Sequence, residues 1–184
     1  MIREMSESRN RVARQALEMF AASSYDAVSM RDLGQALNMQ APSIYSHFPS
    51  KESLLLTTLA PLLDGLDEVF AAVPPAPASA QQRRDWLYRW VGVLIEHRLA
   101  SRVAMYDRAV MGNPVLQPRM WNMHLRLLEA LGAFGVTEHA LANAVIGGIS
   151  LPIHAHSLDT ELPELTVDRA VDLAERLIAA ARTR

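Results

Sequence analysis

The chain has 184 residues, of which 50% are hydrophobic and 21% charged, a composition typical of folded proteins and unlike that of disordered chains. It contains no cysteine, which excludes disulfides and thiolate metal sites. The formal net charge is −2, so any case for nucleic-acid binding must come from local charge. The charged start and the short apolar stretch at 140–153 predict neither export nor a membrane span. We therefore expect a cytoplasmic protein.

Helical patterns run through the chain, and strand patterns are almost absent. Apolar side chains recur with helical spacing over residues 9–22. Ser29, with Asp32 three positions later, predicts a capping box that opens a short second helix. Asn38 follows this helix and tolerates the left-handed backbone of a sharp turn. Pro42 then fits the first turn of a short third helix.

Longer helices are predicted after these three. Ser50 is expected to cap a fourth helix, and the proline-rich run 73–79 is the clearest linker. Five further helices are expected to begin near Ser79, Ser101, Pro118, Thr137 and Thr166. The sequence therefore predicts an all-α protein with about nine helices.

The segment from Ser29 to Leu55 carries the most specific pattern of the chain. It contains Ile44-Tyr45, His47-Phe48 and Pro49-Ser50-Lys51-Glu52, and it resembles the DNA-binding region of TetR-type (tetracycline-repressor-like) transcriptional regulators. The resemblance implies a three-helix helix-turn-helix domain over residues 1–55 and a ligand-sensing and dimerisation domain over residues 56–184. It also implies a repressor that binds palindromic operator DNA as a homodimer and is released by a small apolar or aromatic effector.

The physical pattern of this segment agrees with that function. A short helix after a tight turn can enter the major groove, and we expect Ile44 and Phe48 to anchor it from within. Gln and Ser can read base edges, whereas Tyr and His suit phosphate oxygens. Lys51 stands at a helix N-terminus, which attracts phosphate, while Gln40 is a poor cap. The expected DNA-binding residues are Arg31, Gln40, Ala41, Pro42, Ser43, Tyr45, Ser46, His47 and Lys51.

Aromatic, methionine and histidine side chains recur on three of the later helices. Such side chains suit a site for a flat or hydrophobic molecule, although an ordinary core would show the same residues. Pro61 is expected to bend the fourth helix and make it the moving part. The expected ligand-binding residues are Trp86, Trp90, His97, Met105, Tyr106, Met120, Trp121, Met123, His124 and Leu127.

The last two helices predict a dimer interface. Small residues form a stripe on the helix over 137–154, and the final helix has an apolar face wider than a single core contact requires. The alternative is an internal bundle helix. The expected interface residues are Ala140, Ala144, Gly148, Val171, Ala174 and Ile178.

Other classes of function receive little support from the sequence. His154 and His156 are two residues apart, so on a helix they do not share a face that could hold a metal. We find no nucleophile-elbow pattern and no glycine-rich phosphate loop, and we expect no catalytic residue, cofactor or metal. The remaining alternatives are a helical adaptor that binds another protein without DNA and, formally, an enzyme.

Overall fold

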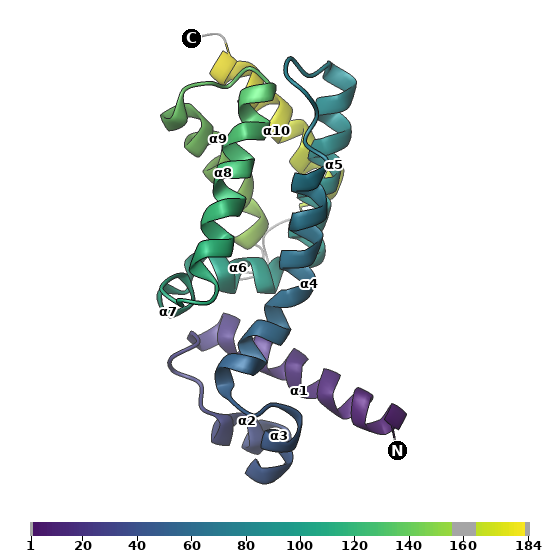
Figure 1. Ribbon diagram of the computed structural model, residues 1–184, viewed down its shortest axis with the longest axis vertical. Coiled ribbons are helices and arrows are strands. Elements are labelled where there is room, and N and C mark those ends of the chain that lie inside the picture. Colours follow the sequence, from purple (N-terminus) through teal and green to yellow (C-terminus); the bar gives the residue numbers. More distant parts are fainter. Residues whose placement is uncertain (1, 156–164, 183–184) are drawn as a thin grey trace. The chain divides into compact units, whose positions relative to one another are not determined.

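The computed structural model describes residues 2–155 and 165–182, and in this part of the chain helices are joined by turns and loops without any strand (Figure 1). The all-α prediction is confirmed for these residues, whereas His156 lies outside them. No described helix is long and apolar enough to cross a lipid bilayer. The helices are α1 (Ile2–Ser23), α2 (Met30–Ala36), α3 (Ala41–His47), α4 (Lys51–Ala71), α5 (Ala80–Glu96), α6 (Arg98–Tyr106), α7 (Arg108–Met111), α8 (Gln117–Ala133), α9 (His139–Ala155) and α10 (Val167–Arg182).

Two helices replace the single one expected after Ser101. Asp107 has an extended backbone, and its carboxylate accepts hydrogen bonds from the backbone N–H groups of Ala109 at 3.0 Å and Val110 at 3.4 Å. It therefore ends α6 and caps α7, because an extended residue with an accepting side chain favours a new helix start. Helix α9 also differs, because it begins at His139 rather than at a Thr137 cap.

Other predicted helix starts are confirmed by their hydrogen bonds. The Ser79 hydroxyl accepts from the backbone N–H of Gln82 at 3.2 Å, and the Gln82 side chain accepts from the backbone N–H of Ser79 at 2.9 Å. At the start of α10, the Thr166 hydroxyl accepts from the backbone N–H of Arg169 at 3.4 Å. Both caps satisfy amides that the first helical turn leaves without a partner.

The chain forms two compact units, and each draws on two stretches of sequence. The first unit holds the chain up to Pro61 and residues 99–117, and the second holds residues 62–98 and the chain from Pro118 onward. This division differs from the predicted boundary at residue 55. Within the first unit, the backbone N–H of Tyr25 donates to the Asp107 carboxylate, and the side-chain amide of Asn113 donates to Glu52 at 3.1 Å. Hydrogen bonds therefore tie residues 99–117 to the N-terminal helices.

The second unit is built around α10, which packs against both α5 and α9. A Cβ atom on Gly148 would lie 2.8 Å from the Leu177 Cδ1 atom, so any side chain at position 148 would require the Leu177 side chain to shift. On the α5 side, Arg83 pairs with Glu175 at 2.8 Å. Close packing on one side and an ion pair on the other hold α10 in this unit.

Candidate nucleic-acid interface

A capping box and a left-handed turn fix the pair α2 and α3. The Ser29 hydroxyl accepts from the backbone N–H of Asp32 at 3.1 Å, and the Asp32 carboxylate accepts from the backbone N–H of Ser29 at 2.9 Å. Asn38 adopts a φ of 53°, and the next amide, that of Met39, donates to the Gly34 carbonyl at 2.8 Å. This is a C-terminal helix cap followed by a tight turn, as the sequence predicts.

The inner face of α3 is anchored by large apolar side chains. Ile44 is 0% exposed and Phe48 is 1% exposed. Leu33 on α2 and Phe20 on α1 are also buried, whereas Leu37 is half-buried. The expected inward packing of Ile44 and Phe48 is therefore confirmed by their burial.

The outer face of α3 is polar and open. Gln40, Pro42, Ser43, Tyr45 and Ser46 are exposed. Gln40 is the N-cap of α3, and its side chain makes no cap hydrogen bond, as expected. His47 is half-buried, Arg31 on α2 is exposed, and Ala41 begins α3. A buried apolar side and an exposed polar side make α3 suited to enter a groove of a polar partner.

The start of α4 adds a positive charge next to α3. Ser50 and Ser53 cap this helix reciprocally, with Ser53 N–H to Ser50 Oγ at 3.0 Å. The Lys51 Nζ atom lies 4.2 Å from the centroid of the Tyr25 ring. Burial raises the pKa of the Tyr25 phenol, and the nearby carboxylates of Glu52, Asp26 and Asp107 raise it further. The ring is therefore neutral when it contacts the ammonium group.

Sequence reasoning did not predict two aromatic–cation contacts near α3. The guanidinium carbon of Arg9 lies 5.2 Å from the centroid of the Phe48 ring, and Tyr25 contacts Lys51. Arg9 is exposed but precedes Val12, Ala16 and Phe20 by helical steps, so its place on the same side of α1 as these buried residues was visible in the spacing. No local spacing connects Tyr25 to Lys51.

Much of the predicted ligand-binding set belongs to a core instead. The Trp86 and Trp90 rings stack with centroids 5.8 Å apart, and the Trp86 indole N–H donates to the Val69 carbonyl at 3.0 Å. Both side chains are 2% exposed, so they fill the interior of the second unit. Met123 and Leu127 are buried there as well.

The other members of this set do not form one site. Met105 and Tyr106 belong to the first unit, whereas the rest belong to the second. Trp121 is 62% exposed, because it lies on the open side of α8. The half-buried members in the second unit are His97, Met120 and His124.

Half of the predicted dimer set is also buried within the chain. Val171 and Ala174 are 0% exposed and Ile178 is 1% exposed, because α10 lies against both α5 and α9. These three residues are not on an open face of the chain, so the interface proposed below does not use them. Gly148 packs against Leu177 of the same chain.

Two other members of the predicted dimer set lie on the open face of α9. Ala140 and Ala144 are exposed, and they continue along the helix into Gly147 and Leu151. Leu151 is 59% exposed, and a Cβ atom on Gly147 would face open space. We call these four residues the α9 stripe.

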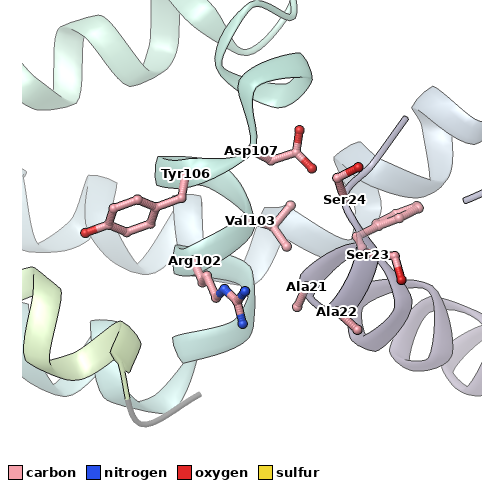
Figure 2. A pocket seen from close by; sticks show the side chains of 9 residues that line it. Ala21, Ala22, Ser23, Ser24, Arg102, Val103, Tyr106 and Asp107 are labelled. Atoms are coloured by element: carbon pink, nitrogen blue, oxygen red, sulfur yellow. The ribbon is translucent and has the colours of Figure 1, made fainter. Parts of the chain in front are cut away.

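Two of the hollows in the described part of the chain bear on the predicted sites. One of about 280 Å³ lies between the end of α1 and α6, and Tyr106 is among its lining residues (Figure 2). The other, of about 460 Å³, lies between α4 and α5 beside Gly65 and Gly92. Neither is lined by the predicted residues of the second unit. Among the described residues, no group of three or more His, Cys, Asp and Glu side chains is placed to hold a metal.

Comparison with known proteins supports the same reading of the N-terminal region. Residues 13–58 match the model of the family described as bacterial regulatory proteins, tetR family. The transcriptional regulator TcmR of Streptomyces glaucescens is 29% identical over 92 residues, which are 48% of this chain and 39% of TcmR. The transcriptional repressor KstR2 of Mycolicibacterium smegmatis is 29% identical over 101 residues, which are 55% of this chain and 49% of KstR2. The chain thus spans about half or less of the length of these relatives.

Solved structures extend the likeness to nearly the whole chain at the level of the fold. AmtR of Mycobacterium smegmatis has a TM-score of 0.74 at 18% identity, covering 95% of this chain and 92% of AmtR. KstR2 of Mycobacterium tuberculosis, named a ketosteroid transcriptional regulator, has a TM-score of 0.72 at 16% identity, covering 96% of this chain and 93% of that protein. Residues 13–58, which include the capped helix-turn-helix, are therefore similar to the DNA-binding region of the tetR family, and the chain shares the fold of these solved regulators.

Proposed function

We propose that this chain is a repressor that binds palindromic operator DNA as a homodimer and leaves it when a small molecule binds. The observation that carries the proposal is the two-sided character of α3, whose apolar side is buried under Ile44 and Phe48 while its polar side is open. A helix held in this way can lie in the major groove of DNA. Such a regulator acts where the chromosome lies, which agrees with the cytoplasmic location expected from the sequence.

The proposed DNA contacts divide by chemistry. Gln40 and Ser43 can exchange hydrogen bonds with base edges, so they are assigned to sequence reading. Tyr45, His47 and Lys51 are assigned to phosphates, which fix the register of the protein on the duplex. The remaining members of the interface are Arg31, Ala41, Pro42 and Ser46. Only a few cations are needed, which reconciles DNA binding with a net charge of −2.

The proposed dimer forms through the α9 stripe. Alanine and glycine allow two helix backbones to approach closely, and Leu151 supplies an exposed apolar side chain beside them. A two-fold axis through this surface would place the same residues on both sides of the contact. Two recognition helices related by that axis would read two inverted half-sites.

The proposed effector binds the second unit. Trp86 and Trp90 fill its core, so we assign the contacts to the half-buried side chains of His97, Met120 and His124, which suit a partly apolar molecule. Pro61 lies inside α4 and has no N–H for the helical ladder, which supports α4 as the bending element. Effector and DNA must then oppose each other reciprocally, with a coupling of roughly 1–3 kcal/mol.

The decisive experiment is to select bound sites from random double-stranded DNA with the full chain. Its mass in solution is measured alongside by sedimentation. We expect selected sites with an inverted repeat and the mass of a dimer. Isolated sites without a repeat would contradict the two-fold model, and recovery of no DNA at all would favour the helical adaptor. Effectors are then screened by thermal shift and by release of the selected DNA.

A further inference from the structure

The Lys51 ammonium group rests on an aromatic surface. Its Nζ atom lies 4.2 Å from the centroid of the Tyr25 ring, inside the range of about 6 Å over which a cation is attracted to the face of a ring. The neighbouring carboxylate of Glu52 accepts a hydrogen bond from the Asn113 side-chain amide at 3.1 Å. The Lys51 ammonium group is thus in cation–π contact with the Tyr25 ring.

Tyr25 is itself held in place at two points. The Phe20 ring meets it edge to face, with centroids 5.2 Å apart and an interplanar angle of 65°. Its backbone N–H donates to the carboxylate of Asp107. Figure 2 shows this carboxylate directed from the end of α6 toward Ser24 at the end of α1, directly before Tyr25 in the chain. Because both its ring and its backbone are held, Tyr25 offers the Lys51 ammonium group a rigid surface.

We propose that Tyr25 is a positioning residue for DNA binding, whose ring holds the Lys51 ammonium group where it meets an operator phosphate. The proposal rests on the DNA-binding function proposed above and assigns to this function a residue that makes no DNA contact of its own. A free lysine side chain loses much rotamer freedom when it is fixed. A lysine that already rests on the ring loses less of it on binding, so its phosphate contact is stronger.

The chemistry of both groups allows the ring and the phosphate to share one ammonium. An ammonium group carries three N–H donors, so the side turned away from the ring stays available to phosphate oxygens. The phenol is neutral, because burial and the nearby carboxylates raise its pKa. The attraction therefore comes from the ring face, and it does not require the phenolic oxygen.

The test is a double-mutant cycle on the full chain, with DNA sites selected as described above and affinity measured over a range of salt. Tyr25→Leu removes the ring face, and Tyr25→Phe keeps it. We expect Tyr25→Leu to weaken binding by about twofold to fivefold per half-site and Tyr25→Phe to bind as the wild type does. In a Lys51→Ala background, Tyr25→Leu should cause no further loss.

A measurement on the free wild-type protein makes the test independent of whether Tyr25→Leu folds. The Lys51 Hε protons should resonate upfield because of the Tyr25 ring current, and they should stay upfield when DNA binds. Equal losses from Tyr25→Leu with and without Lys51, tighter binding by Tyr25→Leu, or return of the Hε signals to ordinary positions on DNA would overturn the positioning role while leaving DNA binding intact. Failure of the wild type to bind any DNA would instead overturn the proposed function.

Discussion

The open faces of α3 and α9 differ in chemistry. The open face of α3 carries Gln40, Ser43 and Tyr45, whereas the open face of α9 carries mostly apolar residues, namely alanines, Gly147 and Leu151, with the exposed Asn143 beside them. Both helices have a well-buried opposite side, so neither face is open because its helix is loosely packed. A polar open face suits a hydrated, charged partner such as DNA, and an apolar open face suits a surface like itself.

The inner sides of the two helices also differ. The short helix α3 is anchored by the large side chains of Ile44 and Phe48. The longer helix α9 approaches α10 closely at Gly148, where a Cβ atom would meet Leu177. Large anchors fix one short helix firmly, whereas small residues let two long helices lie against each other. The comparison predicts that substitutions on the inner side of a helix lower the stability of the fold. Substitutions on the outer side are expected to affect binding to DNA or to a second subunit instead.

The largest expected effect comes from the inner side of α3. Ile44→Ala leaves a cavity at a fully buried position, and we expect it to lower the free energy of unfolding by about 2–5 kcal/mol. Urea denaturation followed by circular dichroism measures this loss. The matched control on the outer side is Ser43→Ala, which should change stability by less than about 0.5 kcal/mol. Similar losses in both variants would contradict the two-sided description of α3.

The next effect concerns the open side of α9. Leu151→Glu places a charge on the α9 stripe, and a two-fold contact contains it twice. We expect the dissociation constant of the dimer to rise at least about 100-fold, or roughly 3 kcal/mol, as measured by sedimentation equilibrium. Leu125→Glu is the control, since Leu125 is a 47% exposed leucine on α8. Dissociation caused by Leu125→Glu and not by Leu151→Glu would move the interface to α8.

A third prediction separates base reading from phosphate binding on the DNA-binding side. Gln40→Ala should reduce discrimination at one base position by roughly 1–3 kcal/mol. Lys51→Ala should weaken binding to all sequences alike and lower the log–log salt slope by about 1 per half-site. Binding to a panel of single-base variants of the selected site, at several salt concentrations, measures both. A change of sequence preference in Lys51→Ala and not in Gln40→Ala would reverse the assigned roles.

The smallest effect is the pH dependence of the α2 cap. The hydroxyl and backbone N–H of Ser29 donate to the Asp32 carboxylate and hold its pKa below the ordinary value of 3.8. Because the folded pKa is the lower one, the cap stabilises fully above the unfolded pKa and loses its effect as pH falls through the folded pKa. Between about pH 5 and pH 2, Asp32→Asn should therefore lose less stability than the wild type. Ser29→Ala removes one donor to the Asp32 carboxylate, so it should also lose less stability than the wild type as the pH falls. If both variants lost as much stability as the wild type over this range, the assigned role of the cap would be contradicted.

Local signals explain why the helix-turn-helix could be predicted from the sequence. Ser29 and Asp32 are close in the chain and form their capping box without help from other elements. Asn38 determines its own backbone conformation, and the spacing of Ile44 and Phe48 defines the inner side of a short helix. Each feature depends on residues only a few positions apart, so one sequence is enough to identify it.

Tertiary packing explains why the second unit was harder to predict. The sequence indicates that α10 has a wide apolar face, but α5, one of the two helices that cover it, is far away in the chain. Trp86 likewise stacks on Trp90 and donates a hydrogen bond to the Val69 carbonyl. An aromatic helix face has the same pattern whether it lines a pocket or fills a core. The contact between Tyr25 and Lys51 was missed for the same reason, since it joins two elements.

The division of each unit between two stretches of chain bears on how the protein is made. The first unit takes its last residues from 99–117, including Asp107 and Asn113, which bond to Tyr25 and Glu52. During synthesis, the first unit can therefore be completed only after Gln117 has left the ribosome. The second unit likewise needs residues from Pro118 onward before residues 62–98 can complete their packing. We expect a fragment that ends at Pro61 to be less resistant to proteolysis than the same residues in the full chain, because it lacks both bonds. A chimaera that exchanges DNA specificity between relatives should accordingly carry residues 99–117 together with the N-terminal helices.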